Sequence, residues 1–197
     1  MGKIFYLMGK SSSGKDTIYK DLVSDKELQL NTIVMYTTRP IREGETDGVE
    51  YYFSSEDELR RLLADGKIIE LRAYNTVHGV WKYFTVNDEQ IQLAANNYAV
   101  IGTLVSYEKM RDYFGAGRVI PIYIEVEDGV RLQRALDRER RQKEPKYAEM
   151  CRRFLADSED FSEDKLEKLG IGYRFVNQEL PECISHIKTF ISKEIMI

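Results

Sequence analysis

The sequence predicts an α/β protein in which a parallel five-stranded sheet carries helices on both faces. Short apolar runs alternate with helical patterns along the chain, and strands joined by helical crossovers are parallel within a sheet. The 197 residues, of which 43% are hydrophobic, suffice for one domain with a substantial core. The expected strands are 3–8, 32–36, 98–102, 119–126 and 173–176.

Helices are expected between and after these strands. Their apolar residues recur at three- and four-residue spacing, as on the buried face of a helix. The expected helices are 14–24, 90–96, 107–114, 129–142, 146–160 and 181–195. Sheets of this kind bind ligands beyond the carboxyl ends of their strands.

A glycine-rich segment at such a strand end has the pattern of a phosphate-binding loop. Glycines let successive backbone N–H groups point into one concavity, and a helix N-terminus favours anions. Lys15 adds a mobile charge for the outer phosphates. The segment predicts a P-loop NTPase fold that binds ATP. The ATP-binding candidates in it are Gly9, Lys10, Ser11, Ser12, Ser13, Gly14, Lys15, Asp16 and Thr17.

The residue after Lys15 departs from this pattern. A hydroxyl is expected there as a ligand of Mg²⁺, but the sequence has Asp16 followed by Thr17. Because Mg²⁺ usually keeps several waters and takes one or two carboxylates, our hypothesis is that Asp16 binds the ion through water. Thr17 is a further candidate ligand.

Charge and rare residue types exclude several functions. A net charge of −4 gives no positive field to attract nucleic acid. Cys151 and Cys183 lie far apart, and His78 and His186 form no metal-binding cluster. The apolar run 4–8 is too short for a signal peptide or a membrane span, and no later run is long enough. We expect a soluble cytoplasmic protein that binds neither nucleic acid nor membrane; the sequence does not indicate its oligomeric state.

Residues 37–86 interrupt the alternation of strands and helices. They are rich in Arg, Glu, Tyr and Gly, with a helical pattern at 55–64 and strand-like pieces at 67–73 and 80–86. We interpret them as a sub-domain inserted after the second strand. The remaining core comprises 1–36, 87–130 and 161–197.

Residues 131–160 crowd arginines into an otherwise acidic chain. Pro145 and its polar neighbours predict two helices joined by a turn. Such charge runs are usually a solvated helix face; the functional alternative is a hinged lid that closes arginines onto phosphates. The arginines in this segment are Arg131, Arg134, Arg138, Arg140, Arg141, Arg152 and Arg153.

Residues 37–53 carry polar residues and a glycine at fixed intervals. The pattern reads Thr37-Thr38-Arg39, then Arg42, Glu45, Gly48, Tyr51 and Phe53. Together with the phosphate loop, it resembles the signature of the guanylate kinase family, and the resemblance runs from Lys3 to about Phe190. It implies a monophosphate-binding sub-domain, a lid, and phosphoryl transfer from MgATP to GMP or dGMP. ATP, GMP and Mg²⁺ are the implied small-molecule partners.

The resemblance also implies an acceptor site with a phosphate end and a base end. Two arginines three residues apart can fork a phosphate dianion, and a glutamate can hold them in place. Glu70 matches the carboxylate that accepts from guanine N–H groups. Tyr83 and Thr85, which follow Val77-His78-Gly79, take the places of a phosphate donor and a base donor. The GMP-binding candidates are Arg39, Arg42, Glu45, Tyr51, Glu70, Tyr83 and Thr85.

Purely structural roles are the alternative for several of these residues. Tyr51 and Tyr83 could be sub-domain core, Glu70 could be a surface strand residue, and His78 is interpreted as a turn residue. Arg39 and Arg42 have little to pack against in a loop rich in Gly and Glu.

Phosphoryl transfer requires positioning and charge neutralisation more than a covalent nucleophile. We expect Lys15 to follow the transferring group. Arg138 and Arg153 match the lid positions of the family and would cover charge on the equatorial oxygens. Arg134 is a candidate for ATP binding, and Arg140 and Arg141 are alternatives within the same helix.

The match weakens at the base end of the acceptor site. The family carries aspartates at a strand end, whereas the matching stretch 100–104 has no carboxylate, and Met35 or Tyr36 stands where a Ser is expected. Fewer base contacts predict looser selectivity. The Gly-Lys-Asp loop also resembles that of ribose 1,5-bisphosphate phosphokinases, which gives a sugar-phosphate kinase as the alternative. A non-catalytic binding module ranks lower, because the phosphate loop and the lid arginines are all present.

Overall fold

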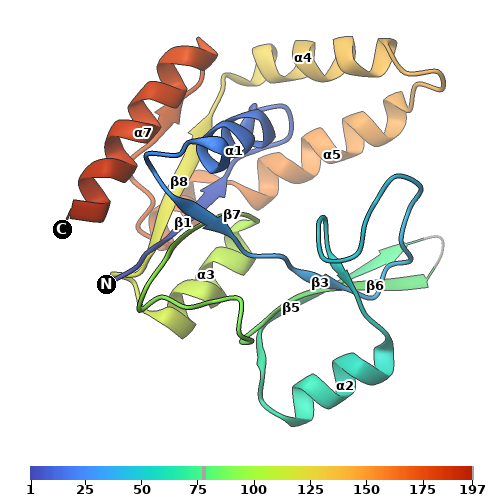
Figure 1. The fold of residues 1–197 in the computed structure, drawn as a ribbon. Helices are drawn as coiled ribbons and strands as arrows, with labels where there is room; N and C mark the ends of the chain where they lie inside the picture. Colours follow the sequence, from blue (N-terminus) through green and yellow to red (C-terminus); the bar gives the residue numbers. More distant parts are fainter. Residues whose placement is uncertain (77–78, 197) are drawn as a thin grey trace.

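The computed structural model describes residues 1–76 and 79–196. Its main sheet has five parallel strands in the order β2-β7-β1-β8-β9, and helices cover both of its faces (Figure 1). The predicted α/β class with a five-stranded parallel sheet is therefore confirmed. The strands are β1 (Ile4–Met8), β2 (Leu30–Thr32), β7 (Asn97–Ile101), β8 (Val119–Glu125) and β9 (Phe175–Val176).

The central strand β1 separates two apolar layers, and all of its residues are buried. Because successive side chains of a strand point to opposite faces, Tyr6 packs into one layer and Phe5 and Leu7 into the other. The first layer includes residues of α3 (Leu104–Phe114) and α6 (Glu163–Lys168), and the second includes residues of α1 (Lys15–Ser24) and α7 (Leu180–Met196).

The part of the chain that follows β2 and precedes β7 forms a second sheet. It has four strands in the order β4-β3-β6-β5, and α2 (Glu56–Ala64) packs on it through Leu59 and Leu62. Figure 1 shows this sheet and α2 at the lower right, beside the main sheet. Its strands are β3 (Tyr36–Thr37), β4 (Tyr52–Phe53), β5 (Ile68–Thr76) and β6 (Gly79–Val86). His78, which was interpreted as a turn residue, lies outside the described residues.

The arginine-rich segment forms two helices that pack against each other, α4 (Asp128–Arg140) and α5 (Tyr147–Asp160). Residues 141–146 connect them and contain Pro145, where the sequence predicts a turn. Helix α6 has no counterpart among the expected elements. Within the described residues, no helix has the length and apolar character to cross a bilayer.

Two expected elements are wrong, and Gln90 accounts for both. The strand expected at 32–36 lies at Leu30–Thr32, and residues 90–96 form turns instead of a helix. The Gln90 side chain accepts from the Val34 N–H at 2.8 Å and donates to its carbonyl oxygen at 3.2 Å, so Val34 cannot extend the ladder with β7. The Gln90 carbonyl accepts from the Tyr98 hydroxyl at 2.9 Å. Such local side-chain bonds compete with a regular helix.

Candidate active site

The loop between β1 and α1 turns at two positions where only glycine fits. Gly14 has a φ of 87° in the left-handed region, and a Cβ there would lie 2.6 Å from Asn177 Nδ2. A Cβ at Gly9 would lie 2.6 Å from the carbonyl oxygen of Ile124. The two glycines therefore let the loop pack closely against residues of β8 and of the segment after β9.

Donors at this loop are available to a ligand. Gly14, the N-cap of α1, has no side chain that could take up the N–H groups of the first turn, and this end of a helix favours anions. Asn177 Nδ2 donates to the Ser13 carbonyl at 2.8 Å and fixes the loop. Within the described part of the chain, the buried Ser12 Oγ and Ser13 Oγ have no hydrogen-bond partner.

Lys15 begins α1 and lies among charges of both signs. Burial is the largest influence and lowers the pKa of its ammonium group, while Asp16 and Asp157 oppose this effect. Arg153 and Arg138 lower the pKa further. Charged residues from α1, α4 and α5 thus act on one ammonium group, which suits a site for a polyanion.

Arg138 and Arg153 lie together at the loop. Both line a cavity of about 190 Å³ that Ser11 also borders, and Arg153 Nη2 donates to Ser11 Oγ at 3.1 Å. Arg134 lies elsewhere on α4, where its Nη2 donates to the Asn177 carbonyl at 3.4 Å. Three candidate arginines therefore contact or border the loop or the residue that fixes it.

Two residues that tie the helix pair to the loop had no individual role in the sequence analysis. Arg131 is 1% exposed; its Nη1 donates to the Ser11 carbonyl at 3.1 Å, and its Nη2 pairs with Asp128 at 2.7 Å. Asp157 Oδ2 accepts from the Ser11 N–H at 2.7 Å. Arginine crowding alone does not reveal which arginine is buried, whereas an acidic residue within a basic segment was a usable signal for Asp157.

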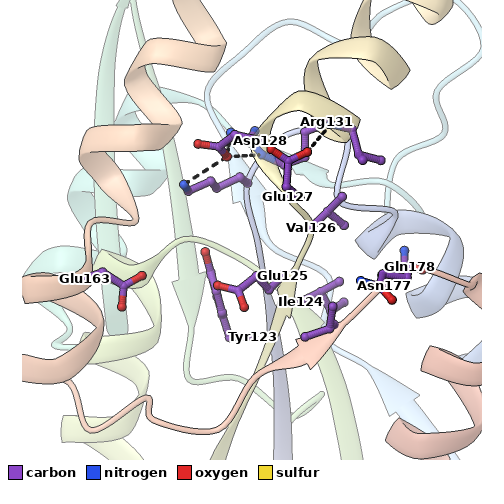
Figure 2. A pocket seen from close by; sticks show the side chains of 13 residues that line it. Tyr123, Ile124, Glu125, Val126, Glu127, Asp128, Arg131, Glu163, Asn177 and Gln178 are labelled. Carbon is purple, nitrogen blue, oxygen red and sulfur yellow. Dashed lines mark hydrogen bonds and ion pairs between the residues drawn. The ribbon is translucent and has the colours of Figure 1, made fainter.

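A larger cavity of about 480 Å³ lies at the carboxyl ends of β8 and β9 (Figure 2). Asp128 lies between Lys10 Nζ at 3.5 Å and Arg131. The other acidic residues that line this cavity are Glu125, Glu127 and Glu163. Because carboxylates dominate the charged lining, the arginine-bordered cavity is the better match for phosphates.

Arg39, which follows β3 of the second sheet, is held in one orientation by Glu45. Arg39 is 3% exposed, and its Nη1 and Nη2 donate to the two Glu45 oxygens at 3.0 and 2.8 Å. These hydrogen bonds raise the pKa of Arg39 and lower that of Glu45. The guanidinium also lies over the rings of Tyr51 and Phe53, at 5.6 and 5.5 Å. Its orientation is fixed before any ligand arrives.

Arg42 is exposed, in contrast to Arg39. Its backbone N–H donates to Glu45 at 2.8 Å, and its guanidinium lies 5.9 Å from the Trp81 ring centre. Tyr83 packs edge-on against Tyr51 at 5.6 Å. The predicted phosphate-binding residues therefore share one face of the second sheet.

Glu70 lies on β5 of the same sheet, and its carboxylate accepts hydrogen bonds from neighbouring side chains. Arg72 donates to both of its oxygens, at 2.9 and 3.2 Å, and Thr85 Oγ1 donates at 3.0 Å. Arg72 Nη2 also meets Met35 Sδ at 3.5 Å. Arg72 was missed in the sequence, although residues two apart on a strand point to the same face.

This fold and these motifs have counterparts among known proteins. A family model described as guanylate kinase matches residues 1–194. The chain belongs to the guanylate kinase family. A guanylate kinase from Porphyromonas gingivalis is 28% identical over 207 residues and covers 98% of both chains. One from Bacillus subtilis is 36% identical over 73 residues, which are 37% of this chain and 36% of that protein. The crystal structure of guanylate kinase from Anaplasma phagocytophilum matches with a TM-score of 0.69 at 20% identity, covering 100% of this chain and 87% of that one, in agreement with the predicted P-loop NTPase fold.

The guanylate kinase resemblance implies a carboxylate near the end of β7, and the packing there explains its absence. A Cβ at Gly102 would lie 2.0 Å from the Tyr6 hydroxyl. Tyr6 is buried and donates to Ser106 Oγ at 2.7 Å, and burial raises the pKa of its phenol. The tyrosine of β1 therefore fills the space that a side chain at 102 would need.

Proposed function

We propose that this member of the guanylate kinase family transfers the γ-phosphoryl group of MgATP to GMP or dGMP, releasing ADP and GDP or dGDP. The observation that carries the proposal is the convergence of Lys15, Arg138 and Arg153 at the phosphate loop. Three cations at one point can neutralise a triphosphate and the group that leaves it. Family membership supplies the acceptor class.

In this proposal the loop of residues 9–17 holds the triphosphate. Its backbone N–H groups and the first turn of α1 would donate to phosphate oxygens, and Lys15 would bind the outer phosphates. Arg134, which contacts the Asn177 carbonyl, would bind the rest of the ATP molecule.

The acceptor phosphate would lie at Arg39 and Arg42. Because Glu45 already orients Arg39, binding costs little of that side chain's conformational freedom. Tyr51 and Tyr83 would supply hydroxyl donors beside it. Glu70 and Thr85 would serve the base end of the same site.

Mg²⁺ would be held near Asp16 and Thr17. Both side chains are exposed in the first turn of α1, directly after Lys15. A carboxylate and a hydroxyl are oxygen donors of the kind that Mg²⁺ accepts, often through its own waters, so these residues fit the ion. When bound, the ion supplies further neutralisation of phosphate charge.

The chemical step requires alignment of donor and acceptor without a covalent intermediate. Arg138 and Arg153 would cover charge on the equatorial oxygens of the transferring group. Packing of α4 and α5 over the loop would also exclude water, which would otherwise compete with the acceptor.

The test is ADP release from MgATP with GMP, dGMP, AMP, UMP, CMP and ribose 1,5-bisphosphate as acceptors. We expect GMP and dGMP to give the highest kcat/KM. Because a hydrogen bond to a charged group contributes about 1.5–3 kcal/mol, Arg39→Met should raise KM for GMP by about 10- to 150-fold and leave KM for ATP nearly unchanged. Arg60→Met, at an exposed arginine of α2, is the matched control. A higher kcat/KM for the sugar bisphosphate would contradict the proposal.

A further inference from the structure

Residues 10–13 form a tight turn within the phosphate loop. The Ser13 N–H donates to the Lys10 carbonyl at 3.2 Å and closes the turn. Its third residue, Ser12, has a φ of 63°, whereas Ser11 before it has no positive φ. This combination is the type II arrangement, in which the third position favours glycine. A serine in this conformation is strained, so the surrounding structure must hold it there.

The orientation of the peptide between Ser11 and Ser12 distinguishes the two common turn types. Type I and type II turns differ by a rotation of this central peptide through about 180°, and type I gives the third residue a φ of about −90°, which serine adopts easily. The C=O and N–H of a trans peptide point in opposite directions, so the rotation also reverses the Ser12 N–H. The group that holds the Ser11 carbonyl therefore decides where this N–H points.

Arg131 holds that carbonyl. Its Nη1 donates to the Ser11 oxygen at 3.1 Å, while its Nε and Nη2 donate to Asp128 at 3.0 and 2.7 Å. Figure 2 shows this pair at the start of α4. The Phe154 ring centre lies 4.5 Å from the guanidinium carbon, and the residue is 1% exposed. The guanidinium is thus fixed on several sides before a ligand binds, and the Ser12 N–H points away from it.

The Ser12 N–H is available to a ligand. Within the described residues it has no acceptor. In contrast, the Ser11 N–H donates to Asp157 at 2.7 Å, and the Ser13 N–H is used inside the turn. Neighbouring backbone N–H groups that point into one concavity form a nest that binds anions. In its type II form the turn therefore offers such a nest a free donor.

We propose that Arg131 is a positioning residue for the phosphate loop, which holds the strained Ser12 conformation so that the Ser12 N–H is directed at a phosphate oxygen of ATP. This inference rests on the function proposed above, in which the loop binds the triphosphate. Arg131 does not touch the nucleotide and acts through the Ser11 carbonyl. Without it, the peptide relaxes towards the type I orientation, and ATP must rotate it back on binding.

Glycine at position 12 separates this role from a general packing role. Because glycine adopts a positive φ without strain, the loop of Ser12→Gly does not need Arg131 to keep its form. We expect Arg131→Met to raise the Kd for ATP, measured by calorimetry without an acceptor, by about 5- to 30-fold, which corresponds to about 1–2 kcal/mol. In combination with Ser12→Gly, the same substitution should raise the Kd by about threefold at most, relative to Ser12→Gly alone.

Loss of positive charge is the competing explanation for weaker ATP binding. Asp157 lies 3.6 Å from Arg131 Nη1, so its carboxylate is less neutralised in Arg131→Met. Ser12→Gly changes no charge, and a purely electrostatic effect of Arg131→Met would therefore be the same with and without it. An equal rise in Kd in the two backgrounds, or no rise in either, would overturn the proposal. Arg60→Met, at an exposed arginine of α2, should leave the Kd unchanged.

Gln29 provides a matched control for the relief of strain. It precedes β2 and is, besides Ser12, the other described residue apart from glycine with a positive φ, at 49°. Gln29→Gly should relieve strain of the same kind outside the loop and should not restore ATP binding to Arg131→Met. Restoration by Gln29→Gly as large as that by Ser12→Gly would show a general gain in stability and contradict the proposal.

Removal of Arg131 alone takes a buried partner from two carboxylates, which can unfold a protein. The double variant Arg131→Met with Asp157→Asn removes both charges of one pair, and thermal unfolding verifies the fold. We expect Ser12→Gly to restore ATP binding in this variant too, and a failure to do so would count against the proposal. If ATP binding follows the expected pattern but GMP is not phosphorylated, the proposed function is wrong and the role of Arg131 stands. Absence of ATP binding by the unmodified protein would overturn both.

Discussion

Lys15 has a folded-state pKa below its usual value of 10.5, because burial and two arginines outweigh Asp16 and Asp157. As pH rises through that lowered pKa, the free enzyme loses the charge proposed to bind the outer phosphates. We expect kcat/KM for ATP, which reports groups of the free enzyme, to fall at a lower pH than an unperturbed lysine would give. Lys15→Arg stays charged over this range, so an alkaline decline that persists in it would belong to another group.

Glu45 holds a buried guanidinium on one side and a backbone N–H on the other. In Glu45→Gln the charge of the pair is lost and Arg39 becomes mobile. We expect KM for GMP to rise about 5- to 30-fold, in line with about 1–2 kcal/mol of lost orientation, with KM for ATP nearly unchanged. Equal changes in both constants would show a general loss of structure instead. Glu50→Gln, at an exposed carboxylate of the same segment, is the matched control.

Spacing along the sequence identified those candidates whose residue types a tight turn or a phosphate group requires locally. The glycines of the loop and the series from Arg39 to Phe53 could be found because tight turns and phosphate forks require particular residue types. Arg131 and Asp157 could not be assigned from spacing, since their contacts with Ser11 depend on how α4 and α5 pack against the loop. Arg72 could have been found, because it stands two residues after Glu70 on the same strand. Met35 was noted only as a departure, and its contact with Arg72 depends on the pairing within the second sheet.

At the level of elements, the end of β7 is shaped by its neighbour β1. Gly102→Ala would place a Cβ 2.0 Å from the Tyr6 hydroxyl, so the strand or the tyrosine must shift. We expect the free energy of unfolding to drop by about 1–3 kcal/mol, as for other overpacked cores, measured by urea denaturation. Gly117→Ala is the matched control, because no atom lies within 4 Å of a Cβ there. Equal stability of the two variants would refute this packing explanation.

Helix α5 places a carboxylate where the loop would bind phosphate. Asp157 accepts from the Ser11 N–H at 2.7 Å and so competes with an anion for that donor. In Asp157→Asn the negative charge is removed, and we expect the Kd for ATP to decrease about 3- to 10-fold, which corresponds to about 0.7–1.4 kcal/mol. Calorimetric titration measures this. Glu159→Gln, at an exposed residue of the same helix, is the control. A larger Kd for ATP in Asp157→Asn would show that the carboxylate assists binding.

Most elements follow from apolar periodicity, and the exceptions have local causes. The strand expected at 32–36 ends early because the Gln90 amide takes both backbone groups of Val34. The helix expected at 107–114 begins earlier, at Leu104, because Thr103 and Ser106 form a capping box. Side-chain bonds to the backbone are the common reason, and they carry no signal in hydrophobic patterning.

At the scale of the whole molecule, three parts carry the candidate residues. The main sheet carries the phosphate loop, residues of α4 and α5 hydrogen-bond to Ser11 of that loop, and the second sheet, which lies beside the main sheet (Figure 1), carries Arg39 and Glu45 in the segment between β3 and β4. This arrangement matches a reaction in which charge neutralisation and alignment provide most of the rate enhancement. Substitutions confined to the phosphate loop should therefore weaken ATP binding more than GMP binding, and substitutions confined to the second sheet should do the reverse. Both should reduce phosphoryl transfer.

The most direct test is identification of the phosphorylated product. Incubation with MgATP and GMP, followed by ³¹P NMR, should show GDP and ADP rising together in equal amounts, and Lys15→Met should slow both by about 100-fold or more, as expected for removal of a main charge-stabilising group. The formation of ADP and inorganic phosphate without GDP, or of GDP at an equal rate in Lys15→Met, would contradict the proposal that this protein is a GMP kinase built on its phosphate loop.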